Sequence, residues 1–282
     1  MVYVFCAFYG ECSGLIKHYN LKKRQTDKYY RFDVFENENQ PVRIILTGQG
    51  SVMAAAAVSG AASFFGIKAE DAIINVGTCA GDYEPGQVFI CNKITEEATG
   101  RTFYPDMILR SGMPESDLVT VPVVIRKSIH EYANKDSHNM ELYDMEAAAI
   151  YQAANLYVGP HRMGFVKVVS DNGDIEGLTP DCIKGLMAEA VDEIASYVDM
   201  FVADTHDMCR AEESTQFTNQ LCKDLHCSKV MENQVRQLIK YLSLEGTDYM
   251  TYINKLYNEG RLPAHDKKNG KVCLDEIKRE LL

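Results

Sequence analysis

Apolar runs alternate with alanine-rich amphipathic segments up to Val202. Runs of this length that are almost wholly apolar are typical of strands covered on both faces of a sheet. Segments with helical periodicity lie between them, so the pattern predicts an α/β/α layered domain. The predicted strands are Val2 to Phe5, Val42 to Leu46, Ala72 to Val76, Val88 to Cys91 and Phe165 to Val169, and the main predicted helices are Val52 to Phe65, Met145 to Leu156 and Cys182 to Val202.

The pattern changes after Asp204, where the segments become amphipathic, polar and helical, with breakers such as Gly246, Gly260 and Pro263 between them. We therefore predict two parts: a domain over 1–204 and a small helical C-terminal extension of unknown role over 205–282. An extension of this size has a marginal core of its own. Its predicted helices are Gln216 to Leu225, Lys229 to Leu242, Asp248 to Tyr257 and Leu274 to Leu282.

Charge and composition narrow the class of ligand. The net charge is -11 and no stretch is strongly basic, which argues against nucleic acid and anionic membrane surfaces as partners and favours a small molecule. The first residues predict a strand and not a signal peptide, and no apolar run reaches the ~20 residues of a membrane span. We expect a cytoplasmic protein whose nine cysteines are reduced thiols.

Polar residues cluster where the predicted strands end. Ligands of layered α/β domains collect at the carboxyl ends of strands, so these residues are the candidates for chemistry. A further segment, Tyr143 to Ala149, places two carboxylates around a methionine at the start of an alanine-rich helix, where acids favour the helix dipole. The strand ends are Ala7 to Glu11, Thr47 to Gly50, Gly77 to Gly81 and Ser170 to Asp174.

Together these motifs resemble the nucleoside phosphorylase and nucleosidase superfamily, and within it the 5′-methylthioadenosine/S-adenosylhomocysteine nucleosidases. The resemblance covers about residues 1 to 200. It rests on the order of the motifs: an Ala-x-x-x-Glu ending at Glu11, a Gly-x-Gly before an Ala-rich helix, Asn75-Val76-Gly77-Thr78, Asp144-Met145-Glu146-Ala147 and Ser170-Asp171. It implies a nucleoside phosphorylase-like sandwich with a mixed central sheet, a purine nucleoside substrate, no cofactor or metal, and a homodimer in which a loop such as Arg101 to Tyr104 closes the neighbouring site.

The resemblance also implies roles for individual residues. Asp171 is then the general acid at purine N7, and Glu11 is the general base for the attacking water. Glu146 binds the ribose hydroxyls and Met145 lies against the sugar, where a cationic transition state forms. The remaining expected substrate-binding residues are Asp144, Thr47, Gly48, Ser170, Ala7 and Thr78. Asp144 departs from the family, which usually has Glu there. The segment between Arg126 and Leu142 looks shorter than in the family, so the sequence does not place the aromatic residue that stacks on the base in those enzymes.

The N-glycosidic bond of a nucleoside can be cleaved with either water or phosphate as the nucleophile. Phosphorylases of this superfamily hold phosphate with arginines after the first and fourth strands, and Tyr9 to Ser13 and Glu84 to Gln87 contain none. A carboxylate at Glu11 would repel phosphate, so hydrolysis is predicted. Because Arg43 and Arg101 are still available to bind phosphate, a phosphate-dependent phosphorylase is one alternative. A catalytically silent nucleoside-binding protein is the other.

Each motif also has an ordinary structural interpretation. Asp171 could cap a turn, and Glu146 and Met145 could be a first-turn acid and a core residue. Gly48-Gln49-Gly50 lacks the third glycine of a dinucleotide loop. A zinc site is the other interpretation of Cys222, His226 and Cys227, with Cys209 and His206 upstream, but these lack paired Cys-x-x-Cys units, so we predict no zinc site. The combination of motifs favours the nucleosidase interpretation.

Overall fold

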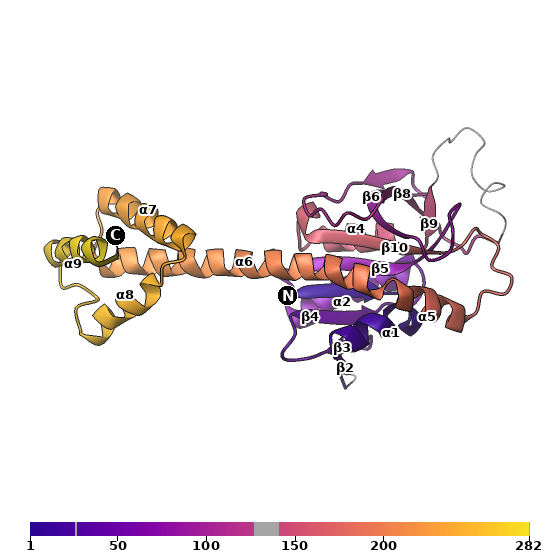
Figure 1. Ribbon diagram of the computed structural model, residues 1–282, viewed down its shortest axis with the longest axis horizontal. Helices are drawn as coiled ribbons and strands as arrows, with labels where there is room; N and C mark the ends of the chain where they lie inside the picture. Colours follow the sequence, from indigo (N-terminus) through magenta and orange to yellow (C-terminus); the bar gives the residue numbers. More distant parts are fainter. Residues whose placement is uncertain (26, 127–140, 282) are drawn as a thin grey trace. The chain divides into compact units, whose positions relative to one another are not determined.

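The computed structural model describes residues 1–25, 27–126 and 141–281, except the side chains of 206–214. It divides into two compact units, Met1–His206 and Asp207–Leu282, which we name the α/β unit and the helical unit. Figure 1 shows their elements. One helix, α6 (Val191–Asp224), crosses the boundary between them, so the predicted boundary at residue 204 falls inside a continuous helix.

The α/β unit is built on one mixed sheet. At its centre β1, β4, β5 and β10 run parallel, and β10 pairs with both β5 and β6. The pairings β5–β10–β6–β8–β9–β5 therefore close into a ring beside the open part of the sheet. The strands are β1 (Val2–Cys6), β2 (Lys22–Lys23), β3 (Asp33–Glu36), β4 (Val42–Leu46), β5 (Ala72–Gly81), β6 (Val88–Glu96), β7 (Arg101–Phe103), β8 (Glu115–Thr120), β9 (Leu142–Asp144) and β10 (Met163–Asp171).

Helices cover both faces of this sheet. Residues of α2 (Ser51–Phe65) and α4 (Ala147–Ala154) pack with Phe5, Ile73 and Phe165 in one buried cluster. Residues of α1 (Tyr9–His18), α5 (Pro180–Glu189) and the first part of α6 pack with the opposite sides of the same strands in a second cluster. The sheet is thus the middle of three layers, as predicted. A short 3-10 helix, η1 (Pro160–Arg162), leads into β10.

The five predicted strands and the mixed sheet are confirmed, while the helix boundaries needed correction. The helix predicted over Cys182 to Val202 is two helices, because α5 begins at Pro180 and ends at Glu189 before α6 begins. The segment Gln216 to Leu225, predicted as a separate helix, is instead the last part of α6. The strands β2, β3, β7, β8 and β9 were not predicted, since none is a long apolar run.

The helical unit has a core of its own. Leu225, Val235, Leu242, Ile253 and Leu274 are buried together with other apolar side chains of all four helices. The helices are the end of α6, α7 (Lys229–Glu245), α8 (Tyr249–Asn258) and α9 (Lys267–Leu281). In the described part of the chain, no helix combines the length and the apolar character that crossing a membrane would require.

Candidate active site

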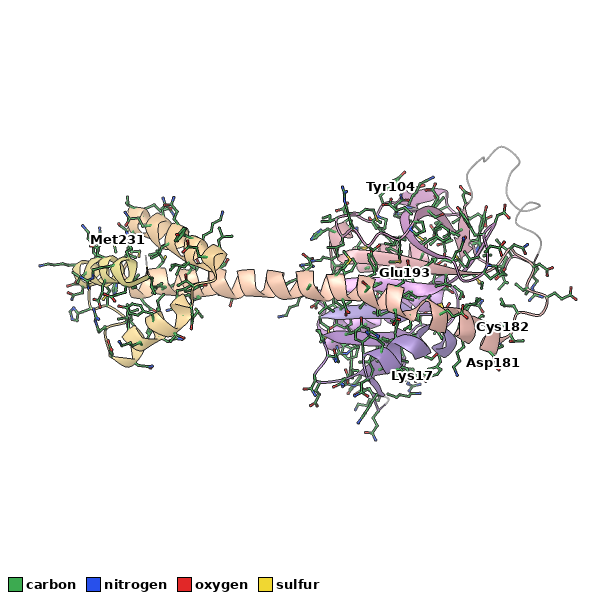
Figure 2. The ribbon with its side chains drawn as sticks, in the orientation of Figure 1. Lys17, Tyr104, Asp181, Cys182, Glu193 and Met231 are labelled. Carbon is green, nitrogen blue, oxygen red and sulfur yellow. The ribbon has the colours of Figure 1, made fainter. Side chains whose placement is uncertain are left out.

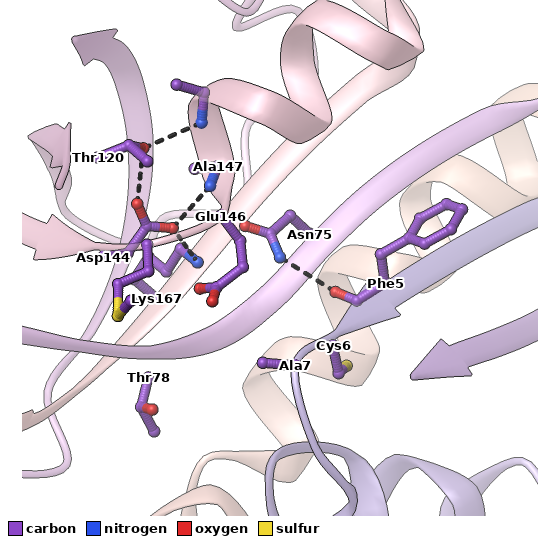
Figure 3. Close-up of polar contacts among 12 residues, drawn as sticks. Phe5, Cys6, Ala7, Asn75, Thr78, Thr120, Asp144, Glu146, Ala147 and Lys167 are labelled. Carbon is purple, nitrogen blue, oxygen red and sulfur yellow. Dashed lines mark hydrogen bonds and ion pairs between the residues drawn. The ribbon is translucent and has the colours of Figure 1, made fainter. Parts of the chain in front are cut away.

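A cavity of about 180 Å³ lies at the carboxyl ends of β1, β5 and β10 and beside the start of α4. Ionisable side chains from separate elements meet there, and Figure 3 shows Asp144 and Glu146 among them, with Lys167 paired to Asp144. The lining residues used below are Ala7, Glu11, Thr78, Asp144, Met145, Glu146, Ser170 and Asp171, together with apolar residues such as Val121, Ile125, Ile175 and Leu178.

Glu11 occupies the point where the pairing of β1 with β5 ends. One carboxylate oxygen accepts the Ala7 N–H at 2.8 Å, and the other accepts the Thr78 N–H at 2.7 Å and the Thr78 hydroxyl at 2.9 Å. Ala7 and Thr78 lie just beyond the last paired residues of the ladder, Phe5 and Asn75, so the carboxylate bridges backbone donors of both strands. Glu11 is thereby fixed and buried at the wall of the cavity.

Glu146 is held at the start of α4. It is the residue that precedes the first turn of that helix, and its carboxylate accepts the Gly50 N–H at 2.6 Å. Neighbouring contacts tie the same two segments together, because the Ser51 hydroxyl donates to the Met145 carbonyl and the Gln49 amide contacts the Met145 sulfur. The beginnings of α2 and α4 therefore set the position of Glu146 together.

Both carboxylate oxygens of Asp144 are bonded to other groups of the protein. Its carboxylate accepts the Thr120 hydroxyl at 2.7 Å and the Ala147 N–H at 2.9 Å, and it forms a 2.8 Å ion pair with Lys167. Figure 3 shows these contacts as dashed lines. The side chains of Asp144 and Lys167 are 0% and 1% exposed. Although Asp144 borders the cavity, its oxygens serve to anchor α4 and Lys167.

Asp171 ends β10 and is half-buried. Its carboxylate accepts the Ser170 hydroxyl at 2.7 Å and the Gly173 N–H at 2.8 Å, so it caps the following turn as the structural interpretation of the sequence predicted. It also lines the same cavity as Glu11 and Glu146. The two interpretations of Asp171 are therefore compatible.

Two predicted residues lie outside the lining. Thr47 is buried, and its hydroxyl donates to the Gly48 carbonyl at 2.6 Å and contacts the Cys6 carbonyl at 3.3 Å. Gly48, which has a φ of 75°, belongs to the turn that leads into α2. Both residues shape the backbone around the cavity without bordering it. Most of the short segment between Arg126 and Leu142, in which the sequence placed no base-stacking aromatic residue, lies outside the described residues.

Burial and charge shift the titration of this cluster. Burial raises the pKa of Glu11, opposed by the hydrogen bonds from Thr78 and by the charge of Lys167. Burial and the neighbouring Asp144 raise the pKa of Glu146 to about 7, against the lowering effect of Lys167. Perturbed carboxyl groups that face one cavity are typical of functional sites.

Lys167 and Thr120 were missed from the sequence. Lys167 lies inside the apolar run Phe165 to Val169, whereas the search for site residues looked at strand ends. A lysine in the middle of a buried strand is itself a signal, because buried lysines are rare unless paired. Thr120 ends β8, an unpredicted strand, and its hydroxyl accepts the Ala148 N–H at 3.0 Å while donating to Asp144.

The cysteine and histidine residues give no further candidate. Among the described residues, no three His, Cys, Asp or Glu side chains are arranged to hold a metal ion. His206 and Cys209, which belong to the zinc alternative weighed from the sequence, have side chains outside the described part. The cysteines that the structure describes are free thiols.

Comparison with known proteins places the fold in the nucleoside phosphorylase and nucleosidase class. Sequence comparison finds no matching family model and no matching curated relative. Structural comparison does find matches. The 5′-methylthioadenosine/S-adenosylhomocysteine nucleosidase of Neisseria meningitidis is 22% identical with a TM-score of 0.57, over 70% of this chain and 97% of that one.

Two further matches have the same fold. The 5′-methylthioadenosine nucleosidase of Arabidopsis thaliana is 17% identical with a TM-score of 0.59, over 71% of this chain and 95% of that one. The futalosine hydrolase of Helicobacter pylori is 10% identical with a TM-score of 0.54, over 73% of this chain and 97% of that one. At these identities the comparison establishes the nucleoside phosphorylase-like fold that the motifs implied.

Proposed function

We propose that the α/β unit hydrolyses the N-glycosidic bond of a purine nucleoside of the 5′-methylthioadenosine or S-adenosylhomocysteine type. The products are the free purine and the ribose moiety. The observation that carries this proposal is that Asp171, Glu146 and Glu11, which come from three different elements, face one cavity. The structural neighbours named above are nucleosidases and a futalosine hydrolase, which supports the reaction class.

The proposed reaction breaks the bond between the purine N9 and the sugar C1′. The bonding electron pair leaves with the base, and protonated Asp171 transfers its proton to N7, so that the leaving group is neutral. The oxygen of a water molecule bonds to C1′ and gives a proton to Glu11. Glu146 holds the ribose hydroxyls, and the carboxylates beside the sugar stabilise the positive charge that develops on it.

The positions of two arginines favour water over phosphate as nucleophile. Arg43 donates to Glu36 at 2.7 Å and lies over the Phe65 ring, and Arg101 donates to Gln152 at 3.0 Å. These are the arginines that left phosphorolysis open in the sequence, and neither lines the cavity. A phosphate dianion needs charge-assisted bonds of the kind that arginine provides.

The surroundings of Asp171 point the same way. A larger hollow of about 730 Å³ shares Ser170, Asp171 and Leu178 with the cavity. Its lining includes the acidic side chains Asp82, Glu84, Asp174 and Glu176. Like charges disfavour an anionic co-substrate near this hollow, whereas a neutral nucleoside and water are unaffected.

A product assay tests the proposal. Purified protein is incubated with 5′-methylthioadenosine, S-adenosylhomocysteine, adenosine, inosine and futalosine, with and without phosphate, and the free base is measured. Base released without phosphate is the expected result, with the first two nucleosides the best substrates. Strict dependence on phosphate would show a phosphorylase, and binding without turnover would show a silent nucleoside-binding protein.

We also propose a homodimer in which the segment Arg101 to Tyr104 contributes to the neighbouring site, although its first three residues are strand β7 and not a loop. Tyr104 directly follows β7 and is 59% exposed, and Figure 2 labels it at the surface of the α/β unit. Light scattering should give a mass of about twice the 31.7 kDa chain. If the protein is a monomer that turns over nucleosides at full rate, this part of the proposal is wrong.

A cytoplasmic location is the remaining part of the proposal. The free cysteines of the described residues fit a reducing compartment. Fractionation of cells that produce the protein, followed by immunoblotting of the soluble and membrane fractions, would test this location.

A further inference from the structure

The candidate site buries three carboxyl groups around one lysine. Glu11, Asp144 and Glu146 are 4%, 5% and 8% exposed, and Lys167 is 1% exposed. An unpaired ionised group in a protein interior is so costly that it usually becomes neutral instead. The proposed reaction nevertheless requires Glu11 as a carboxylate, because a base must be able to accept the proton of water. Lys167 has no part in that reaction, so its position needs an explanation.

The strand register places Lys167 next to Glu11. Lys167 of β10 pairs with Gly77 of β5, and side chains of paired residues in parallel strands lie on the same face of the sheet. A Cβ atom on Gly77 would lie 3.0 Å from a Glu11 carboxylate oxygen. Glu11 therefore fills the space that the missing side chain of Gly77 leaves open. The lysine on the adjacent strand lies beside that space.

Asp144 fixes the position of the Lys167 ammonium group. The Lys167 ammonium lies 2.8 Å from the Asp144 carboxylate, which is fixed in turn by the Thr120 hydroxyl and the Ala147 N–H. Thr120 accepts the Ala148 N–H, so β8, β9 and the first turn of α4 all contribute to the arrangement. The ammonium group is thus held in a constant place near both glutamates.

We propose that Lys167 is a positioning residue of this site: clamped by Asp144, its ammonium group supplies the buried positive charge that allows Glu11 to be a carboxylate at neutral pH. This inference rests on the proposed function, in which Glu11 activates water. It also gives Asp144 a role, that of holding the lysine, in place of the substrate contact that the sequence suggested.

The other titratable groups around the lysine do not provide this charge. Glu146 is an acid, and the nearby thiols of Cys6, Cys79 and Cys91 are buried. Burial raises the pKa of all three thiols, so they are neutral at neutral pH. The charge of Lys167 lowers the pKa of Glu11, and the charge of Asp144 raises the pKa of Glu146.

The test compares three variants by the pH dependence of kcat/KM. The double variant Lys167→Met with Asp144→Asn removes both charges at once, so that neither partner is left unpaired and the fold is preserved. We expect its acid limb to move upward by about one pH unit or more, so that activity at pH 7 falls about threefold or more and recovers as the pH is raised further. Lys167→Arg keeps the charge, so its limb should stay near that of the wild type.

Asp144→Asn distinguishes the effect of fixing the Lys167 ammonium group from the effect of its charge. This variant keeps the lysine and removes an anion, so its acid limb should not move upward, although its kcat should fall because the ammonium is no longer fixed. A merely structural pair would instead lower activity equally at every pH in all three variants. Near-ultraviolet circular dichroism and thermal unfolding of each variant show whether the fold is intact.

A titration without substrate distinguishes this inference from the proposed function. In protein labelled with ¹³C at the glutamate carboxyl carbon, the Glu11 signal is assigned from its loss in Glu11→Gln. Its midpoint should be higher in the double variant than in the wild type. An unchanged midpoint in a folded double variant would overturn the role of Lys167. A higher midpoint in a protein that cleaves no nucleoside would uphold it and refute the proposed function alone.

Discussion

The two units of this chain differ most in what they bury. The α/β unit buries Glu11, Asp144, Glu146 and Lys167 beside a cavity, whereas Thr218 is the one buried polar side chain among the described residues of the helical unit. The charges are also divided unequally. Acidic and basic residues balance in 207–282, so the net charge of -11 belongs to the α/β unit.

This contrast shows the difference between an almost wholly apolar core and one that also borders the candidate site. The helical unit follows simple amphipathic rules, with apolar side chains inside and polar side chains outside. The α/β unit keeps ionisable groups out of water at a cost to stability, which is characteristic of functional sites. Changes in the α/β unit should therefore alter chemistry and pH dependence, while changes in the helical unit should alter stability alone.

The largest expected effect is on the catalysis that we propose for the α/β unit. Asp171→Asn should lower kcat by about 10²- to 10⁴-fold, because an amide cannot transfer a proton to the leaving purine. Thermal unfolding should change little, since Asn can still accept from Gly173. The matched control is Asp174→Asn on the same turn, at an exposed position. Near-normal turnover in the Asp171 variant would remove the general acid from the proposed mechanism.

The next effect concerns the core of the helical unit. Leu242→Ala should destabilise that unit by about 2 to 5 kcal/mol, because Leu242 is fully buried and the truncation leaves a cavity. Leu244→Ala on the same helix is the control, since Leu244 is 79% exposed. Calorimetry should show an earlier transition in the Leu242 variant only, with the rate of nucleoside cleavage at 25 °C retained. A loss of activity would mean that the two units are coupled.

A smaller effect is expected where α9 approaches the end of α6. A Cβ atom on Gly270 would lie 1.8 Å from the Leu225 carbonyl oxygen, so Gly270→Ala forces the backbone to shift. We expect a loss of about 1 to 3 kcal/mol in chemical denaturation. Gly185→Ala in α5, where nothing lies within 4 Å of the added atom, should instead stabilise its helix slightly. Equal results for the two substitutions would contradict the packing described for α9.

The smallest effect is the pH dependence that Glu146 confers on folding. The pKa of Glu146 is raised to about 7 from 4.5, so between these values the folded protein keeps a proton that the unfolded chain has released. Stability is therefore highest at the acidic end of this window and falls as the pH rises through it, by about 1 kcal/mol between pH 6 and pH 7. Denaturation at both pH values should show this difference in the wild type and a reduced one in Glu146→Gln.

The sequence predicted the layers and most of the cavity wall because both depend on local patterns. Buried parallel strands are apolar throughout, and their polar ends mark the ligand-binding edge. The short strand β8 was missed because Glu115 to Thr120 contains only two apolar residues, Leu118 and Val119, and β9 because it has only three residues.

Local sequence patterns could not predict the contacts between segments that are distant in the sequence. Thr120, Asp144 and Lys167 are brought together by the pairing of β8, β9, β5 and β10, and no local signal specifies that pairing. Thr47 shows the opposite error. It has the right residue type at the right strand end, yet its hydroxyl bonds the backbone and does not face the cavity.

Glu11 accepts backbone N–H groups just beyond the last paired residues of β1 and β5. This structural role affects how relatives of this protein should be compared. A descendant that had lost all turnover would still need an acceptor for the amides of Ala7 and Thr78, and would be expected to retain the acid for that reason. Asp171 has only local contacts and is easier to lose. When active and inactive members are sorted, the identity of the residue at position 171 is accordingly the more informative marker.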